Sequence, residues 1–395
     1  MRFVRHLLLG LLAIVALLVG AIAFALYDPF SNGPRVLRRS ELVTAPREDS
    51  RLSAVGEAPI QATDPPALAA LALRYQPTVV VSGFDRFWPM SLSAALKARW
   101  HGRGPCLIEA GHCRVHDPTV TSLTRPGSRA DYLQWPSPLD SIQDNFLSVA
   151  SRLGVGDSLL PGWPRGISRL DPFASAQVYF YRLPRTTRRS YPGLPGGLIS
   201  LEYWFFYPLN YFPIIRIPLL ALSHPITSTV GNTDYHQGDL EHVAVLLDPR
   251  TGQPRYLWMA RHADEGQAYR WHSAAVQWNG EHPTIYAALG SHSSYAHCGI
   301  QRRTRTYFFI NDYVVCLPHL TYGFLPGATP LVDLTHTAWG CWRGHLGEAG
   351  RHLLTGMVAL APYETGGPYS PLLQQENFRT TCRLPPGTPK PATAL

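Results

Sequence analysis

The sequence predicts a mainly β protein, an antiparallel β-sandwich with a few short helices and long loops, preceded by an N-terminal membrane anchor. The 395 residues include 36 prolines and 33 glycines but only 16% charged residues, a composition typical of turn-rich globular proteins. Several short apolar runs between residues 176 and 317 are bounded by turn residues, at the spacing of a sandwich. The anchor is predicted by a long uncharged run near the amino terminus.

Residues 1–27 form the predicted signal anchor. Arg2 and Arg5 precede an uncharged run from Leu7 to Tyr27, and roughly 20 apolar residues are enough to cross a bilayer. Basic residues before the run favour a cytoplasmic amino terminus with everything else exported. Small residues within 21–25 also fit a cleavage site, so a cleaved signal peptide is the alternative, although the length of the run favours an anchor. We therefore expect a periplasmic or extracellular domain.

The cysteines agree with an oxidising compartment, because their number, six, is even and permits disulfides. Cys106 and Cys113 enclose a short loop and form the most credible pair. The other four can pair in three ways, of which proximity in sequence favours Cys298 with Cys316 over pairings that involve Cys341 or Cys382. None of them shows the doubled CxxC spacing of a zinc ribbon.

The chain is expected to divide into four parts. After residues 1–27, residues 28–66 are polar and rich in proline and arginine, which predicts a flexible tether. Residues 67–382 form a single β-sandwich domain, and residues 383–395 form a disordered tail. The domain begins with a helix that leads into the strand TVVVSG, followed by short helices within 90–100 and 139–153.

The strands follow these helices along the chain. Each is a short run rich in β-branched or aromatic residues: 176–183, 198–209, 241–248, 254–262, 274–280, 283–292 and 312–317. The apolar stretch 198–222 is long enough to suggest a second membrane span. Its polar residues and its four prolines favour a buried strand followed by a loop.

The net charge of +8 raises the question of an anionic partner. The basic residues are spread thinly, and the densest stretch, 182–190, is interpreted as a solvated loop that faces anionic envelope surfaces. We predict no nucleic-acid partner.

Titratable residues are concentrated at 234–243, DYHQGDLEHV, where an apolar strand begins. Side chains alternate in a strand, so Asp239 and Glu241 share one face, about 7 Å apart. Gly238 permits a sharp turn that brings His236 toward the same point. Such a buried group needs a counter-charge. Its oxygen-rich donors predict a divalent cation, Ca²⁺ or Mg²⁺ first and Mn²⁺ as an option, whereas turn capping and arginine pairing are the structural alternative.

A second polar cluster follows another strand. The run PTIYAALG ends in SHSSYAHC, which places His292 and His297 beside small residues just past a strand end. Functional side chains often lie on loops held by a rigid scaffold. His292 is therefore the candidate catalytic residue.

These motifs resemble those of a known family. HQGDLEHVAVLLD and GSHSSY are similar to HEGDWEHV and GSHasYp of the vacuolar-protein-sorting-62-like family. The similarity continues in order through residues 75–92, 201–210, 339–348 and 366–378, and so covers roughly residues 70–380. The HxGDxE core also resembles the GHRHDWE heptapeptide of necrosis- and ethylene-inducing-like proteins, a secreted β-sandwich family that binds a divalent metal and whose toxic members attack plant plasma membranes.

The second resemblance implies a set of metal ligands. They are His236, Asp239 and Glu241, with His292 near the metal and Asp234 as the nearest match to a further acid upstream. Three positions depart from the motifs: Gln237 replaces a glutamate of the first family, Leu240 replaces a tryptophan of both, and Gly238 replaces a histidine of the toxin heptapeptide. The last of these argues against a plant-toxin activity.

Three functions are consistent with these observations. The first is an exported, membrane-tethered β-sandwich that recognises a glycan or lipid headgroup at a divalent metal. The second is a metal-dependent hydrolase of envelope or extracellular substrates, in which His292 or Glu241 transfers protons. The third is a structural envelope protein with a purely structural metal. A GxSxG nucleophile motif is not recognisable in the sequence.

Overall fold

The computed structural model describes most of the predicted domain. The described residues are 36–44, 66–83, 85, 87–97, 103–124, 127–135, 178–183, 186, 190–213, 232–261, 266–302, 311–337, 339–347 and 367–374. The predicted anchor 1–27, the predicted helix 139–153 and the tail 383–395 lie outside them. Within the described residues, none of the helices has the length and apolar character needed to cross a membrane.

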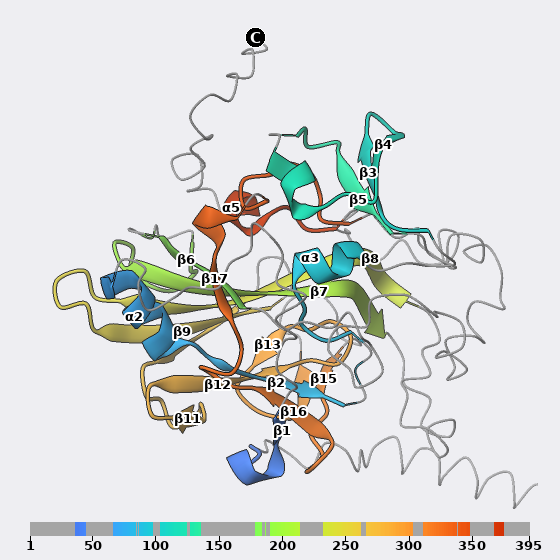
Figure 1. The fold of residues 1–395 in the computed structure, drawn as a ribbon. Coiled ribbons are helices and arrows are strands. Elements are labelled where there is room, and N and C mark those ends of the chain that lie inside the picture. Colours follow the sequence, from blue (N-terminus) through green and yellow to red (C-terminus); the bar gives the residue numbers. More distant parts are fainter. Residues whose placement is uncertain are drawn as a thin grey trace, which may run out of the picture.

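Two six-stranded sheets form the centre of the molecule (Figure 1). The first contains, in spatial order, β10 (Gly266–Arg270), β9 (Pro254–Ala260), β8 (Asn232–Leu247), β7 (Ile199–Pro213), β6 (Val178–Leu183) and β17 (Leu331–Asp333). The second contains β1 (Val43–Thr44), β16 (Thr321–Phe324), β2 (Thr78–Ser82), β12 (His282–Ala287) and β11 (Trp278–Asn279), with β13 (Ser294–Tyr295) paired to β12. The prediction of a mainly β fold with a few short helices is therefore confirmed.

The sheets are mixed, which corrects the prediction of a purely antiparallel arrangement. β1 runs parallel to β16, β2 runs parallel to β12, and β6 runs parallel to β17. The partners in these pairs are far apart along the chain, so no tight hairpin forces the strands to run in opposite directions. Local sequence patterns carry no information about such pairings.

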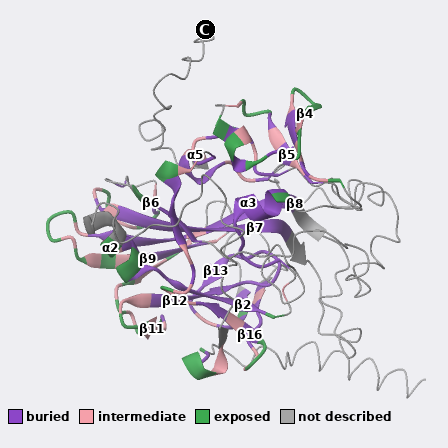
Figure 2. Ribbon diagram, in the orientation of Figure 1, coloured by how far each residue is buried: buried purple, intermediate pink, exposed green. Residues whose placement is uncertain are grey.

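A hydrophobic core lies between the two sheets. The first sheet contributes side chains such as Phe205 and Val243, and the second contributes Val79, Ile285 and Phe324, all at most 2% exposed. Figure 2 shows the buried residues continuing along the strands of both sheets. The face of the first sheet that packs on this core is called the inner face below.

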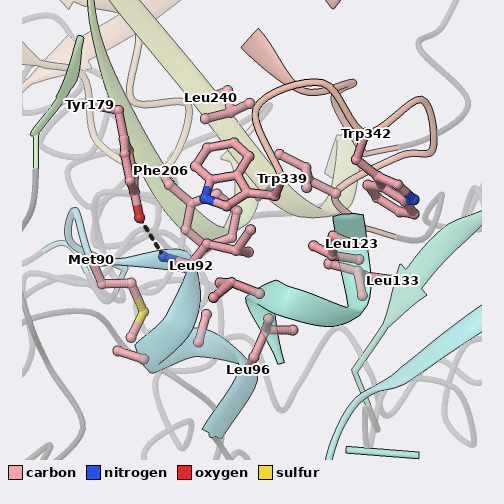
Figure 3. Packing of buried hydrophobic residues seen from close by; sticks show 14 of the residues in the cluster. Met90, Leu92, Leu96, Leu123, Leu133, Tyr179, Phe206, Leu240, Trp339 and Trp342 are labelled. Carbon is pink, nitrogen blue, oxygen red and sulfur yellow. Dashed lines mark hydrogen bonds between the residues drawn. The ribbon is translucent and has the colours of Figure 1, made fainter. Parts of the chain in front are cut away.

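The outer face of the first sheet is also covered. Trp204, Phe206 and Leu240 pack there on a second cluster that includes Leu92 and Trp339 (Figure 3). The covering elements are α3 (Leu92–Lys97), η3 (Val120–Thr124), a small sheet of β3 (Cys106–Glu109), β4 (His112–His116) and β5 (Tyr132–Gln134), the 3-10 helix η6 (Leu334–His336), and α5 (Pro371–Gln374). Because β7 is buried on both faces, apolar residues occupy successive positions in its middle, residues 203–209, instead of alternating with polar ones.

Two of the disulfides follow the predicted pairing. Cys106 is bonded to Cys113, across β3 and β4, and Cys298 is bonded to Cys316. The second disulfide lies beside the hairpin of β14 (Gly299–Arg302) and β15 (Asn311–Val314). Cys341 is also disulfide-bonded, and the one remaining cysteine lies outside the described residues.

Part of the segment predicted as a tether packs on the domain. Residues 36–44 contain η1 (Arg39–Glu41) and β1. Leu37 is fully buried, its backbone N–H donates to the Tyr286 hydroxyl at 3.0 Å, and its carbonyl accepts from Gln277 at 2.7 Å. The polar composition of 28–66 concealed this contact, because one buried leucine and a two-residue strand leave no periodic pattern. The helix predicted at the start of the domain is α2 (Pro66–Tyr75).

Candidate functional site

The motif strand β8 changes its side-chain alternation between Gln237 and Leu240. Leu240 lies opposite Phe206, and both belong to the cluster on the outer face. The Gln237 side chain also points outward, since it accepts from the Trp135 N–H at 2.8 Å and donates to the Trp135 carbonyl at 2.9 Å. Residues three apart cannot share a face in a regular strand, so the backbone between them departs from regular strand geometry. No residue is inserted relative to β7, because Asp239 lies opposite Tyr207 and Gln237 lies opposite Leu209.

Gly238 is the irregular residue, with a φ of 66° that favours glycine. Asp239 lies opposite Tyr207, which belongs to the core between the sheets, and Glu241 follows on the same inner face. Beyond the glycine, alternation returns His236 to the inner face as well. The shared face predicted for Asp239 and Glu241 is therefore present, whereas the sharp turn predicted at Gly238 is not, because β8 continues as one strand from Asn232 to Leu247.

Glycines also allow other segments to press on this strand. A Cβ at Gly238 would overlap the Leu346 carbonyl oxygen, and one at Gly347 would overlap the Gln237 carbonyl oxygen. Gly367 lies against the same carbonyl. The glycine-rich segments around 347 and 367 therefore support the backbone of the motif strand from outside.

His292 joins the two sheets at this end of the sandwich. Its Nδ1 donates to Asp239 Oδ2 at 2.8 Å, and its Nε2 lies 3.6 Å from Asp85 Oδ1 without a hydrogen-bond partner. Its ring stacks on that of Tyr207, with 3.9 Å between centroids and 7° between planes. The residue is 1% exposed and has a φ of 56°, a left-handed conformation that is uncommon outside glycine.

The neighbouring carboxylates determine the charge of His292. Burial by itself lowers the pKa of the imidazole, but Asp85 and Asp239 outweigh it and raise the pKa from 6.5 to about 9. Asp85 acts by its charge, 3.6 Å from Nε2, and Asp239 acts by its charge and by its hydrogen bond to Nδ1. At neutral pH His292 is therefore an imidazolium held between two carboxylates.

Tyr207 indicates that a third carboxylate is close. Burial raises its pKa well above 10, and the charges of Glu241, Asp85 and Asp239 raise it further. Asp239 is 6% exposed and Glu241 is 8% exposed. Three carboxylates therefore act on one tyrosine, and two of them, Asp85 and Asp239, flank the imidazolium of His292.

His236 lies beside this group with both ring nitrogens in contacts. Its Nδ1 lies 2.6 Å from the Gly238 carbonyl, which can only accept, so Nδ1 carries the proton. Its Nε2 therefore accepts from the Asn210 amide at 2.9 Å. Fixing one ring nitrogen on a carbonyl is common among metal-ligating histidines. In this structure His236 would need Asn210 to turn aside before it could ligate a cation.

The other predicted histidines and the upstream acid make no described contact with the group around His292. Asp234 is part of β8, but its side chain is outside the described residues. His297, half-buried, contacts the Cys298 carbonyl and Gln301. His242, in the same motif, points to the outer face and stacks on Trp204 at 4.2 Å, where burial lowers its pKa to about 4.

A compact trio of potential metal ligands elsewhere does not form a metal site. Among the described residues, Cys106, Cys113 and His116 have ligand atoms within 4.8 Å of one another. The two sulfur atoms are bonded to each other, and a zinc-type site requires thiolates. Among the described residues, no trio drawn from Asp85, His236, Asp239, Glu241 and His292 has ligand atoms within that distance either, so these side chains would have to move closer together to hold a cation.

Sequence reasoning missed two members of this group, Asp85 and Tyr207. Asp85 follows the strand TVVVSG directly, and a carboxylate at a strand end was the available signal. It accepts from the Gly290 N–H at 2.9 Å and from the Phe87 N–H at 3.1 Å. Tyr207 lies in the run YWFFY, which is typical of an aromatic core.

The chain matches no protein-family model. It is 29% identical over 131 residues to a vacuolar protein sorting-associated protein of Saccharomyces cerevisiae, TDA6, and 28% identical over 127 residues to vacuolar protein sorting-associated protein 62 of the same yeast. Each match covers 29% of this chain, and the chain spans only about a quarter of each relative, 25% and 24%.

Several solved structures align over most of the chain with low scores. NLPPya in complex with glucosamine gives a TM-score of 0.32 at 12% identity and covers 88% of this chain and 97% of that one. Necrosis and Ethylene inducing Protein 2, from the causal agent of cocoa's Witches Broom disease, gives 0.29 at 12% identity and covers 80% and 92%. The resemblance to vacuolar-protein-sorting-62-like proteins that the motifs indicate is confirmed in sequence, over about a third of the chain.

Proposed function

We propose that this chain is an exported, membrane-tethered protein that binds a divalent cation and recognises a glycan or lipid headgroup there. The observation that supports this proposal is the gathering of Asp85, Asp239 and Glu241 around Tyr207 and His292. Buried carboxylates in excess of their cationic partners are costly, and a divalent cation removes that cost.

The donor chemistry fits a hard cation. Asp85, Asp239 and Glu241 offer carboxylate oxygens, the ligands that Ca²⁺ and Mg²⁺ prefer, and Mn²⁺ accepts the same set. His236 is the nitrogen donor nearest to them along the motif strand. The Nε2 of His292 has no hydrogen-bond partner, and as the N–H of an imidazolium it would donate to an oxygen of a bound ligand. A bound cation would supply open coordination positions for hydroxyl or phosphate oxygens of a ligand.

The residues of this chain have separate roles in that function. Asp239 and Glu241 bind the cation, and the irregular backbone at Gly238 precedes the point from which both side chains lie on the inner face. His292 holds Asp239 in orientation through its Nδ1 hydrogen bond, and Tyr207 supports the imidazole ring by stacking. Burial keeps water away, so each charge acts more strongly than it would in solvent.

Export and tethering rest on the amino-terminal segment. Arg2 and Arg5 before the uncharged run favour an anchor with the domain outside the cytoplasm, periplasmic or extracellular. The Cys106–Cys113 and Cys298–Cys316 disulfides suit an oxidising compartment.

A second candidate function is a metal-dependent hydrolase. It is favoured by the contacts of His292, which has one nitrogen fixed on Asp239 and the other without a partner, so that Nε2 could exchange a proton with a substrate. In that case His292→Gln reduces turnover much more than it reduces cation affinity. Equal loss of both would leave binding as the better account.

The first test is metal content. The full chain, produced in an oxidising compartment and dialysed against Ca²⁺, Mg²⁺ or Mn²⁺, is expected to retain about one divalent ion per molecule by plasma mass spectrometry. Asp239→Asn combined with Glu241→Gln is expected to abolish retention, because both changes remove charge and keep size.

The matched control is Asp248→Asn. Asp248 lies just past the end of the same strand and pairs with Arg255 at 3.1 Å in an exposed position, so its loss should leave the metal content unchanged. A folded wild type without metal contradicts the proposal and favours a structural role. If metal is bound, glycan and lipid arrays with and without EDTA then separate recognition from a purely structural cation.

A further inference from the structure

We infer that Asp312 is a positioning residue of the candidate site, which fixes the loop that carries His292 through Ser291 and Tyr295. The inference rests on the proposed function in one respect: one of its two tests measures the affinity for a cation. The contacts that support it lie on β15 and on residues 288–295, away from the proposed ligands of the motif strand.

The loop that carries His292 has an unusual backbone. Gly290 and His292 both have positive φ, 77° and 56°. The loop is closed by the His292 N–H, which donates to the Ala288 carbonyl at 2.9 Å, and by the Ala288 N–H, which donates to the Ser293 carbonyl at 2.9 Å. A histidine in a left-handed conformation persists only when its surroundings hold it there.

Three carboxylates hold three consecutive residues of this loop. Asp85 accepts from the Gly290 N–H at 2.9 Å, and Asp239 accepts from His292 Nδ1 at 2.8 Å. Between them, Ser291 Oγ donates to Asp312 Oδ1 at 2.8 Å. Asp85 and Asp239 belong to the candidate site, whereas Asp312 lies on β15, where it pairs with Gln301 of β14.

Asp312 is suited to hold the loop rigidly. It is 1% exposed, and its second oxygen accepts from the hydroxyl of Tyr295, at the far end of the loop. Hydrogen bonds to a carboxylate are stronger than those between neutral groups. One carboxylate therefore joins the two sides of the loop, before and after His292.

The strand that carries Asp312 is itself fixed. The Leu289 N–H donates to the carbonyl of Tyr313 at 2.8 Å, and β15 pairs with β14. The Cys298–Cys316 disulfide closes the chain around this hairpin, and both sulfur atoms are in the cluster with Tyr295. Displacement of Asp312 is thus resisted from both sides, as required of a residue that sets the position of another.

The decisive variant is Asp312→Asn in the full chain. Asparagine keeps the size and one acceptor oxygen, but its NH₂ group only donates, so both hydroxyls lose a charged acceptor and one of them can only accept from the amide. Groups that orient metal ligands typically change metal affinity by 10- to 100-fold when altered, and we expect the Ca²⁺ Kd to weaken by about 10-fold by calorimetry. The ring nitrogen signals of His292 in ¹⁵N-histidine-labelled protein are expected to shift as its hydrogen bond to Asp239 loosens.

Asp333→Asn provides the matched control. Asp333 is also a buried carboxylate, accepting from the backbone N–H and the hydroxyl of Thr335 at the start of η6. Its replacement is expected to lower the thermal midpoint and to change neither the Ca²⁺ Kd nor the His292 signals. A purely structural Asp312 would behave in the same way, and that result would overturn the inference.

Variants of Ser291 test the inference if Asp312→Asn does not fold. If Asp312→Asn does not fold, Ser291→Ala removes only the hydroxyl link and must still shift the His292 signals, whereas Ser291→Thr must restore them. Unshifted signals in Ser291→Ala would refute the inference. If the wild type binds no cation, the proposed function fails, and the ring signals of His292 in the metal-free protein still decide the role of Asp312.

Discussion

Replacing Gly238 by alanine is expected to lower the free energy of unfolding by about 2 to 4 kcal/mol, through backbone strain and through a steric overlap. A positive φ at a residue with a Cβ costs about 1 kcal/mol or more. The new methyl group would also overlap the Leu346 carbonyl, and overpacking of this kind costs about 1 to 3 kcal/mol. The carbonyl cannot easily move, because the Leu346 N–H donates to Pro368 at 2.7 Å.

Gly252→Ala separates the two causes. Gly252 has nearly the same φ, 67°, but a Cβ there meets nothing within 4 Å. Its replacement is therefore expected to cost only about 1 kcal/mol, from the backbone conformation alone. Urea unfolding followed by tryptophan fluorescence measures both variants. Equal losses would mean that the contact with Leu346 has no energetic effect.

The local geometry of the motif strand could be predicted from the sequence. Strand alternation places Asp239 and Glu241 together, and glycine permits the irregular backbone that returns His236 to the same face. Both rules act within six residues, so they need no knowledge of the rest of the fold. The Cys106–Cys113 and Cys298–Cys316 disulfides were predictable for a similar reason, because short loops close at small entropic cost.

The remainder of the candidate site could not be predicted in this way. Asp85 and Gly290 are 205 residues apart in sequence, and they meet because β2 pairs with β12. Parallel pairing of distant strands leaves no local signal. Tyr207 was interpreted as core, correctly for its burial, but nothing in YWFFY indicates that one ring supports an imidazole.

Double burial of β7 and β8 explains why their outer face is difficult to recognise in the sequence. Residues far away in the chain, such as Leu92 and Trp339, cover Phe206 and Leu240 there (Figure 3). Apolar residues therefore stand on both faces of each strand, and their alternation cannot identify the face that bears the site. The carboxylates Asp239 and Glu241 mark the inner face of β8.

In the metal-free protein, stability is expected to fall as the pH rises from about 6.5 to 9. The pKa of His292 is raised in the folded state to about 9, from 6.5 in the unfolded chain. Its stabilising contribution is therefore fully present below pH 6.5 and is lost as the pH passes through the folded value. At 1.36 kcal/mol per pKa unit, the loss amounts to about 3 kcal/mol. Urea unfolding in EDTA across this range, for wild type and His292→Gln, isolates the contribution.

Asp85 and Asp239 raise the pKa of His292 and so cause the pH dependence of stability, which means that removing one of these carboxylates provides the control. Asp85→Asn is expected to reduce the pH-dependent difference, because Asp85 is the largest of the influences that raise the pKa of His292. Parallel pH profiles of wild type and His292→Gln would show that the imidazole is not charged between its carboxylates. Added Ca²⁺ should offset the loss at high pH, since a cation could neutralise Asp239 once the imidazolium no longer does. Stability that falls with pH and is not restored by any divalent ion would therefore confirm the charged histidine and argue against the cation.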